Sequence, residues 1–179
     1  MITLASASPQ RRAILEQLGI EFQVVVPDVE ELTGGDPATV VVENALRKAR
    51  AVEGDPVLAA DTEVVLDGRV FGKAANEAEA HEFLSALTGR THEVWGGLAV
   101  READRELTAH AVTRVTFRDF DPAWYIATGE WRNRAGAYAI QGKGTLLVER
   151  IEGDYWNVVG LPLAELVRIA PQLVGADPA

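Results

Sequence analysis

The sequence predicts an α/β domain with a mixed sheet. Helix-opening signals alternate with short apolar runs in the first half of the chain, and longer strand-like stretches fill the middle. The alternation favours parallel strands with helices between them, whereas consecutive long strands favour antiparallel pairs. A length of 179 residues and a hydrophobic content of 47% suit one domain with a complete core. We therefore expect a single domain over residues 1–179.

In the first half, Ser8-Pro9 and Asp36-Pro37 each place a capping side chain before a proline, which suits the first helical position. Gly19 and Gly54 then act as stop signals. The expected elements are a strand over 2–5, a helix from Pro9 to Gly19, a strand over 22–26, a helix from Pro37 to about Glu53, a strand over 57–60 that ends at Asp61-Thr62, a hairpin over 63–70 that turns at Asp67-Gly68, and a helix capped by Asn76 that ends before Gly89.

The second half begins with two long apolar stretches that alternate as strands do. The expected elements are strands over 91–100 and 107–117 joined by a charged turn at 102–106, a helix from Asp121-Pro122 to about Thr128, a loop over 131–136, short strands over 137–140 and 145–151 around a Gly-Lys-Gly turn, and a final helix over 163–173. Strand ends of such a domain converge on one ligand-binding region.

The composition excludes several classes of function. The chain has no Cys, which excludes disulfides, zinc-thiolate sites, iron–sulfur clusters and thiol catalysis. Its 17 Lys+Arg against 27 Asp+Glu give a net charge of -10, which argues against a nucleic-acid polymer or an anionic membrane as partner. No stretch approaches the roughly 18 apolar residues of a membrane span. We expect a soluble, cytoplasmic protein; a small polyanion still needs only a local cluster of cations.

Lysine is scarce, and its positions are informative. The three lysines are Lys48, Lys73 and Lys143, and the last two lie beside glycines. Codon bias toward Arg explains the low total. Glycine lets a backbone approach a ligand closely, and a Lys ammonium is a flexible charge suited to phosphate. The pattern is compatible with phosphate binding.

The segment Ser8-Pro9-Gln10-Arg11-Arg12 directly follows the first expected strand. A helix N-terminus carries free amides and a positive dipole end, so it attracts anions. Arg11 and Arg12 oppose that dipole, and a bound phosphate would remove the conflict. The alternative is two solvated arginines on a surface helix.

Asp61 and Thr62 follow an apolar strand, at a position where α/β proteins bind ligands. A carboxylate there can hold Mg²⁺ or accept a proton from water. Glu30 and Glu31 follow another strand and could supply further ligands. A turn-capping aspartate and a solvated acidic loop are the alternatives.

Gln141 lies beside Gly142-Lys143-Gly144, and its amide could recognise a base edge. A plain hairpin turn would have the same sequence, and the spacing is not that of a Walker A or dinucleotide loop. Gly-x-Ser-x-Gly and a helical His pair are both absent. Taken together, the local cations, carboxylates and Gln141 suggest a Mg²⁺-dependent enzyme acting on a nucleotide.

Over essentially its whole length the chain resembles the Maf family of nucleoside triphosphate pyrophosphatases. The blocks that carry the resemblance occur in the family's order: Leu4-Ala5-Ser6-Ala7-Ser8-Pro9 with Arg11, Ala60-Asp61-Thr62, Gly72-Lys73, residues 87–94 (LTGRTHEV), residues 135–142 (AGAYAIQG), residues 151–155 (IEGDY) and residues 158–162 (VVGLP).

The resemblance implies hydrolysis of a nucleoside triphosphate to the monophosphate and pyrophosphate. The implied fold has two α/β lobes around a central cleft, similar to the inosine triphosphate pyrophosphatases. Asp61 matches the family's general base, and Glu31 with Asp61 would hold Mg²⁺, or Mn²⁺ in its place. The implied substrate-binding residues are Ser8, Arg11, Arg12, Lys48, Thr62, Lys73 and Gln141.

Substrate choice is the finer part of this expectation. The block around Gln141 favours dTTP/UTP over 7-methyl-GTP, and modified pyrimidine triphosphates are a further option. Gln10 stands where many members have Arg, at a position tied to the base preference, and Arg12 is a candidate to compensate. Ala74 replaces the Pro of Gly-Lys-Pro. The resemblance also implies a homodimer. The competing hypothesis is a nucleotide-binding regulator of septum formation that acts through a partner.

Overall fold

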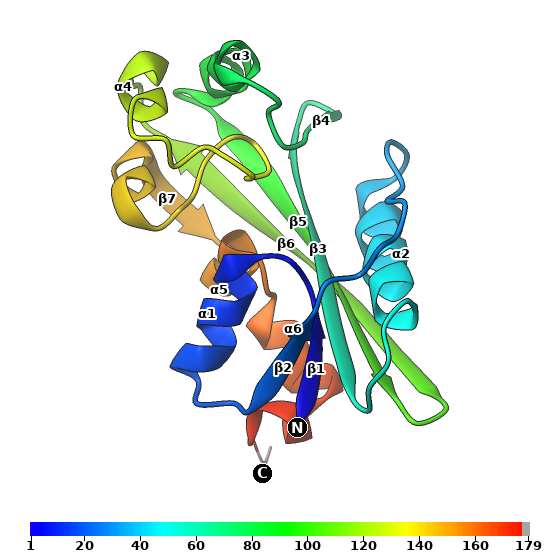
Figure 1. Ribbon diagram of the computed structural model, residues 1–179. Helices are drawn as coiled ribbons and strands as arrows, with labels where there is room; N and C mark the ends of the chain where they lie inside the picture. Colours follow the sequence, from blue (N-terminus) through cyan, green and yellow to red (C-terminus); the bar gives the residue numbers. More distant parts are fainter. Residues whose placement is uncertain (177–179) are drawn as a thin grey trace. The chain divides into compact units, whose positions relative to one another are not determined.

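The computed structural model describes residues 1–176, so the last three residues of the domain expected over 1–179 lie outside the described residues. Seven strands form one sheet in the order β2-β1-β3-β5-β6-β7, with β4 paired to β3 (Figure 1). The strands are β1 (Ile2–Ala5), β2 (Phe22–Val25), β3 (Val57–Leu66), β4 (Arg69–Phe71), β5 (Thr91–Glu102), β6 (Arg105–Phe117) and β7 (Val148–Glu152). β1 runs parallel to β2 and β3, whereas β4 and β7 pair antiparallel. The α/β class with a mixed sheet is confirmed.

The helices follow the capping signals of the sequence. They are α1 (Pro9–Gln17), α2 (Pro37–Arg50), α3 (Glu77–Leu87), α4 (Pro122–Ile126), α5 (Tyr155–Val159) and α6 (Leu163–Ile169), with 3-10 helices η1 (Gly142–Leu147) and η2 (Pro171–Val174). Ser8, Asp36 and Asn76 each accept a backbone N–H three residues later, as an N-cap does. Among residues 1–176, no helix combines the length and the apolar character that crossing a membrane requires.

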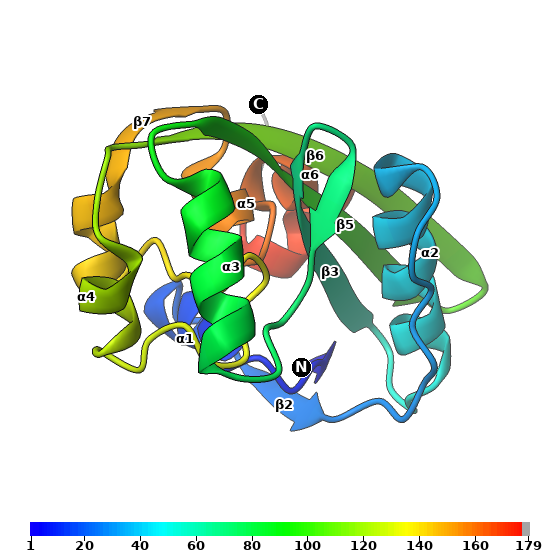
Figure 2. The same ribbon diagram turned by 90° about the horizontal axis from the view of Figure 1, so that it is seen from above.

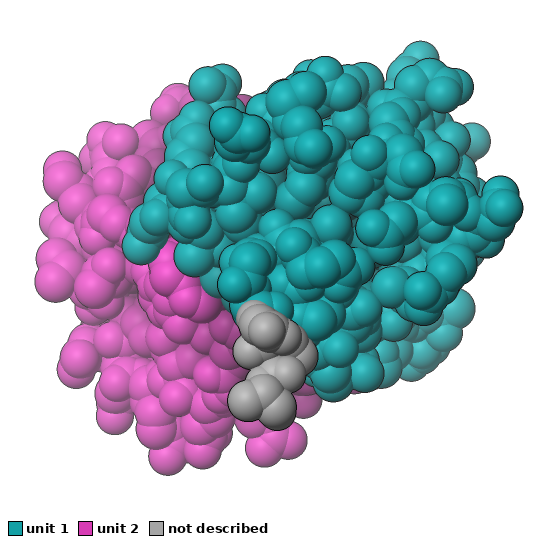
Figure 3. All heavy atoms as spheres, turned by 90° about the horizontal axis from the view of Figure 1, so that it is seen from below, with its two compact units in different colours: residues 1–62, 96–111, 160–179 teal, residues 63–95, 112–159 magenta. Residues whose placement is uncertain are grey.

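The chain forms two compact units, coloured separately in Figure 3. Unit 1 comprises residues 1–62, 96–111 and 160–179, as far as these are described, and unit 2 comprises residues 63–95 and 112–159. Both units are assembled from segments distant in sequence, because β3, β5 and β6 each contribute residues to both.

In unit 1, α2 lies on one side of β1 and β3, and α1 and α6 lie on the other (Figures 1 and 2). The apolar face of α2 packs into a core cluster of Ala5, Ala45, Ala49, Val52, Val57, Ala59 and Ala99. Small side chains let the helix approach closely: a Cβ at Gly97 of β5 would lie 2.0 Å from the backbone oxygen of Val41 in α2. Only glycine fits there.

Unit 2 contains the β3–β4 hairpin, α3, α4 and an aromatic core. Asp67 and Gly68 at the hairpin turn have φ angles of 52° and 77°, the left-handed pair that a tight hairpin needs, so the expected turn is confirmed. The ring of Phe71 packs edge-on against Phe83 at 5.3 Å between centroids. His92, Phe117 and Tyr138 form a second set of edge-to-face contacts.

The expected end of a strand at Asp61-Thr62 is wrong, because β3 continues through both residues to Leu66. Its first residues pair with β1, at Thr3↔Val57 and Leu4↔Leu58, and its last three pair with β4. Successive partners therefore support one long strand. Because β1 ends at Ala5, Asp61 lies beyond the end of this neighbouring strand. The strand end near Asp61 is therefore the end of β1, not the end of β3.

Three further expectations near the C-terminus are wrong. Residues 137–140 form no strand, and the Gly-Lys-Gly segment is the 3-10 helix η1 rather than a hairpin turn. Glu130 accepts the backbone N–H groups of Lys143 and Gly144, which holds this segment against the preceding loop. The last helix ends at Ile169 because Pro171 has no N–H to donate and restricts the residue before it.

Candidate active site

A buried ion pair joins α2 to β3 in unit 1. Nζ of Lys48 lies 2.6 Å from Oδ1 of Asp61 and 2.7 Å from Oε1 of Glu31. The side chains of Lys48 and Asp61 are 8% and 9% exposed, whereas Glu31 is 45% exposed. Three residues that the sequence singled out from separate segments therefore meet around one ammonium group.

Asn44 belongs to the same cluster, and sequence reasoning missed it. Its Nδ2 donates to Oδ2 of Asp61 at 3.0 Å and to the carbonyl of Leu32 at 3.2 Å, while its Oδ1 accepts the N–H of Leu32 at 2.7 Å. Asn44 thus fixes both Asp61 and the loop that carries Glu31. The available signal was its spacing: Asn44 and Lys48 are four residues apart, so they share one face of α2.

The cluster keeps Asp61 ionised. Burial alone would raise the pKa of Asp61, but the charge of Lys48, the hydrogen bonds from Lys48 and Asn44, and the charge of Arg11 together lower the pKa below its ordinary value. An ionised carboxylate in a largely dry setting can bind a cation or orient a water molecule and accept its proton.

Arg11 is buried and reaches three acceptors within unit 1. Its guanidinium donates to the carbonyl of Gly160 at 2.7 Å, to Oγ of Ser6 at 3.3 Å and to Oγ1 of Thr62 at 3.1 Å. Burial lowers the pKa of Arg11, and the charges of Asp61 and Glu31 oppose that effect. The side chain thereby connects α1 to the residue that follows Asp61.

The other residues at the start of α1 behave differently. Ser8 caps the helix and donates its hydroxyl to Oε1 of Gln10 at 3.1 Å. Arg12 is exposed and pairs with Glu16 at 2.8 Å, one turn along the helix. This pair offsets the unfavourable charge of Arg12 at the helix start. The charge of Arg11 is instead turned toward its acceptors at Gly160, Ser6 and Thr62.

Lys73 and Gln141 belong to unit 2, and both are exposed. The backbone of Lys73 bridges that of Ala135, and Gly136 donates its N–H to the carbonyls of Phe71 and Gly72, so the two glycine-containing loops of unit 2 are joined. Gln141 holds the N-cap position of η1 without a side-chain cap bond. Within unit 2, these contacts place the family's Gly-Lys and Ala-Gly-Ala-Tyr blocks side by side.

The donor set of unit 1 fits a magnesium ion that shares its coordination with a substrate. Within residues 1–176, no three His, Cys, Asp or Glu side chains form a metal-binding group on their own. Glu31 and Asp61 supply two carboxylates, which lie near each other because both contact the ammonium group of Lys48. Mg²⁺ in phosphate-processing sites is typically bound by one or two carboxylates, with water and phosphate oxygens as the remaining ligands. Two carboxylates are therefore sufficient.

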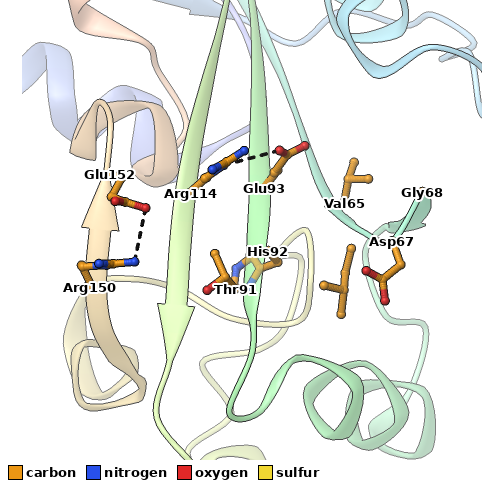
Figure 4. Close-up of a pocket in the computed structure, with 10 residues that line it drawn as sticks. Val65, Asp67, Gly68, Thr91, His92, Glu93, Arg114, Arg150 and Glu152 are labelled. Atoms are coloured by element: carbon orange, nitrogen blue, oxygen red, sulfur yellow. Dashed lines mark hydrogen bonds and ion pairs between the residues drawn. The ribbon is translucent and has the colours of Figure 1, made fainter.

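Unit 2 also contains an open polar pocket of about 530 Å³ (Figure 4). Its charged walls are internally paired: Arg114 lies 3.8 Å from Glu93, and Arg150 lies 3.5 Å from Glu152. The lining residues include none of those that the sequence singled out as site residues. Because none of those residues lines this pocket, the candidate site remains the cluster around Asp61.

His92 lines this pocket, although the residue as a whole is almost completely buried. Its Nε2 lies 2.9 Å from the hydroxyl of Tyr138, and burial lowers the pKa of His92 to about 4. The ring is therefore neutral and packs as part of the aromatic core of unit 2.

The fold and the cluster define an α/β protein whose site chemistry rests on carboxylates and cations. A sequence profile of the family described as Maf-like protein matches residues 1–173, and the chain belongs to this family. The resemblance noted from the sequence blocks is confirmed.

Curated relatives cover nearly the full chain. The chain is 48% identical over 180 residues to a dTTP/UTP pyrophosphatase of Symbiobacterium thermophilum, covering 96% of this chain and 93% of the relative. It is 46% identical to a dTTP/UTP pyrophosphatase of Bacillus cereus, covering 93% and 87% of the two chains. The corresponding protein of Dictyoglomus thermophilum is 47% identical, with 92% of each chain covered.

Proposed function

We propose that this protein hydrolyses a nucleoside triphosphate, with dTTP, UTP or modified pyrimidine triphosphates as substrates, to the monophosphate and pyrophosphate. The observation that carries the proposal is the buried, ionised Asp61, held by Lys48 and Asn44. The relatives that are 46–48% identical over nearly the full chain are named dTTP/UTP pyrophosphatases, which favours the enzyme over the regulator of septum formation.

In the proposed reaction, Asp61 orients a water molecule toward the α-phosphorus and accepts one of its protons. The new bond joins the water oxygen to the α-phosphorus, and the bond from that phosphorus to the α–β bridging oxygen breaks. Pyrophosphate leaves with the bridging oxygen. Cations near these oxygens stabilise the charge that develops on them, and we assign this role to Arg11, Lys48 and Lys73.

The remaining assignments concern substrate binding. Ser8 at the start of α1 and Thr62 beside Asp61 would contact phosphate, and Gln141 would recognise the base edge. Arg12 would contribute only on leaving Glu16, its partner in α1. Gln10 accepts a hydrogen bond from Ser8, which leaves its amide NH₂ as a donor at the position tied to base preference.

We assign the divalent ion, Mg²⁺ or Mn²⁺, to Glu31 and Asp61. When bound, it would neutralise charge on the triphosphate and favour attack at phosphorus. Asn44 and Lys48 would hold the two carboxylates in position before it binds. We further propose a cytoplasmic homodimer, as the family resemblance implies; light scattering coupled to size exclusion measures the mass directly.

The experiment combines a product assay with an isotope label. Purified protein with Mg²⁺ and dTTP or UTP in ¹⁸O-water should release pyrophosphate and place the label in the monophosphate. Label in the pyrophosphate would instead mean attack at the β-phosphorus, and release of orthophosphate would mean that the wrong bond has been assigned. Asp61→Asn should abolish turnover, and Arg50→Ala, on the exposed side of α2, should not.

The same preparation separates the alternatives. A screen of normal and modified triphosphates identifies the preferred base, and preference for damaged pyrimidines would indicate a house-cleaning role. Nucleotide binding without turnover in the wild type, together with a cellular phenotype that survives Asp61→Asn, would instead support the regulator.

A further inference from the structure

The ammonium group of Lys48 occupies the oxygens that a metal ion would need. It contacts Oδ1 of Asp61 at 2.6 Å and Oε1 of Glu31 at 2.7 Å. The other oxygen of Asp61 already accepts a hydrogen bond from Asn44. Both Asp61 oxygens are therefore engaged, and the position between the two carboxylates is held by a positive charge.

A divalent ion and this ammonium cannot both use these oxygens at full strength. A divalent ion bound to these oxygens would lie close to the Lys48 ammonium, and two cations that lie close together repel strongly in a poorly solvated site. The Lys48 side chain is only 8% exposed. These contacts satisfy the carboxylates without any metal. Metal binding then requires that the ammonium be drawn away.

Lysine is suited to such a move. Its charge sits on a flexible four-carbon stem and is not tied to one geometry. A triphosphate bound beside Asp61 would offer phosphate oxygens as new partners for Nζ and would release Oδ1 and Oε1. The incoming anion thus removes the competitor and supplies the remaining metal ligands at the same time.

We propose that Lys48 makes metal binding conditional on nucleotide: it fills the site between Glu31 and Asp61 in the free protein and leaves it when a triphosphate binds. The inference rests on the proposed function for the identity of the anion. Because coupling between two ligands is reciprocal, the same exchange makes nucleotide binding depend on the metal. The outcome is an enzyme that takes up metal and nucleotide together.

The test measures binding of Mn²⁺ alone by electron paramagnetic resonance. Without nucleotide, the wild type should bind Mn²⁺ no more tightly than Glu31→Gln, in which the site has lost a ligand. Lys48→Met should bind Mn²⁺ at least about tenfold more tightly than the wild type, because the competing charge is gone. Lys48→Arg keeps the charge and should stay at the wild-type level.

Arg50→Met is the matched control, since it removes one positive charge from the same helix at a residue paired with the distant Glu106. It should bind Mn²⁺ as the wild type does. In a second measurement, the gain in Mn²⁺ affinity on adding non-hydrolysable α,β-methylene dUTP should be smaller in Lys48→Met than in the wild type.

Two results overturn the inference: wild-type protein that binds Mn²⁺ clearly more tightly than Glu31→Gln in the absence of nucleotide, or Lys48→Met that binds no better than the wild type. The first comparison does not involve the Lys48 variant, so it decides even if that variant fails to fold. Pyrophosphate release by the wild type is scored separately, so loss of the Lys48 inference leaves the proposed hydrolysis standing, and absence of hydrolysis is visible by itself.

Discussion

Nζ of Lys48 lies 2.6 Å from Oδ1 of Asp61, and neither side chain is more than a tenth exposed. Removing one partner of such a pair leaves an uncompensated buried charge, which is strongly destabilising. The contact therefore makes each residue necessary for the other's placement. Its surroundings in unit 1, above all Asn44 and Arg11, give predictions that can be measured one at a time.

Asn44→Ala should reduce kcat by about tenfold or more, because a hydrogen bond to a charged group is lost. Asn44 stabilises the ionised form of Asp61 and so lowers its pKa. Removing that bond raises the pKa of Asp61. The acid limb of the activity profile, below which Asp61 is protonated, should then move to higher pH. The acid limb of the kcat/KM profile is the measurement, with Arg50→Ala as control. A loss of rate with an unmoved acid limb would mean that Asn44 acts only through the fold.

Arg11 and Thr62 should be energetically coupled. The guanidinium donates to Oγ1 of Thr62 at 3.1 Å and remains tied to Gly160 and Ser6. In a double-mutant cycle of Arg11→Met and Thr62→Val, urea unfolding should give an interaction free energy of about 1 kcal/mol. Strictly additive losses would show that the contact contributes nothing to the folded state.

His92 should make the free energy of unfolding depend on pH. Its pKa is about 4 in the folded protein, below the ordinary value of 6.5, because burial disfavours the charged ring. The unfolded chain therefore binds the proton first as the pH falls. The stability contribution is complete above pH 6.5 and is lost progressively from there toward pH 4.

Between pH 7 and pH 5 this linkage amounts to a loss of about 2 kcal/mol. His92→Phe, which keeps an aromatic ring against Phe117 and Tyr138, should lose correspondingly less stability over the same interval. Urea unfolding at the two pH values measures both proteins. Parallel losses in wild type and variant would assign the pH dependence to other groups.

The sequence predicted helices best where nearby capping residues determine the start of the helix. Ser8, Asp36 and Asn76 cap helices as expected because a cap depends on residues three positions apart. Strand β3 was predicted too short, since its continuation through Asp61 depends on β1 and β4 as successive partners. Which strands pair is a property of the whole sheet and is not visible in one segment.

The candidate site likewise contains residues that the sequence predicts and residues that only the folded structure reveals. Asp61 and Lys48 were singled out from the sequence, but Asn44 was not, because a polar residue in a helix normally faces solvent. The register of α2 decides that Asn44 faces inward with Lys48. The bond from Arg11 to Gly160 joins residues 149 positions apart, and nothing local in the sequence indicates it.

Lys73 and Lys143 offer a matched pair for testing the cation assignment. Both are exposed, both lie beside glycine, and both belong to unit 2. We expect Lys73→Ala to lower kcat/KM for dTTP about tenfold or more, because the charge to which we assign stabilisation of the leaving phosphates is lost. Lys143→Ala, which has no assigned role, should change kcat/KM by less than about twofold, and surface substitutions of this kind should alter stability in either case by no more than about 0.5 kcal/mol.

Raising the ionic strength should then reduce the kcat/KM of wild type and Lys143→Ala more than that of Lys73→Ala, because salt screens a charge that the last variant no longer has. Equal losses in the two lysine variants would indicate a general electrostatic effect of unit 2 rather than a contact. A loss confined to Lys143→Ala would move the assignment to the segment that follows Gln141. Steady-state kinetics of the three proteins at two salt concentrations distinguish these outcomes.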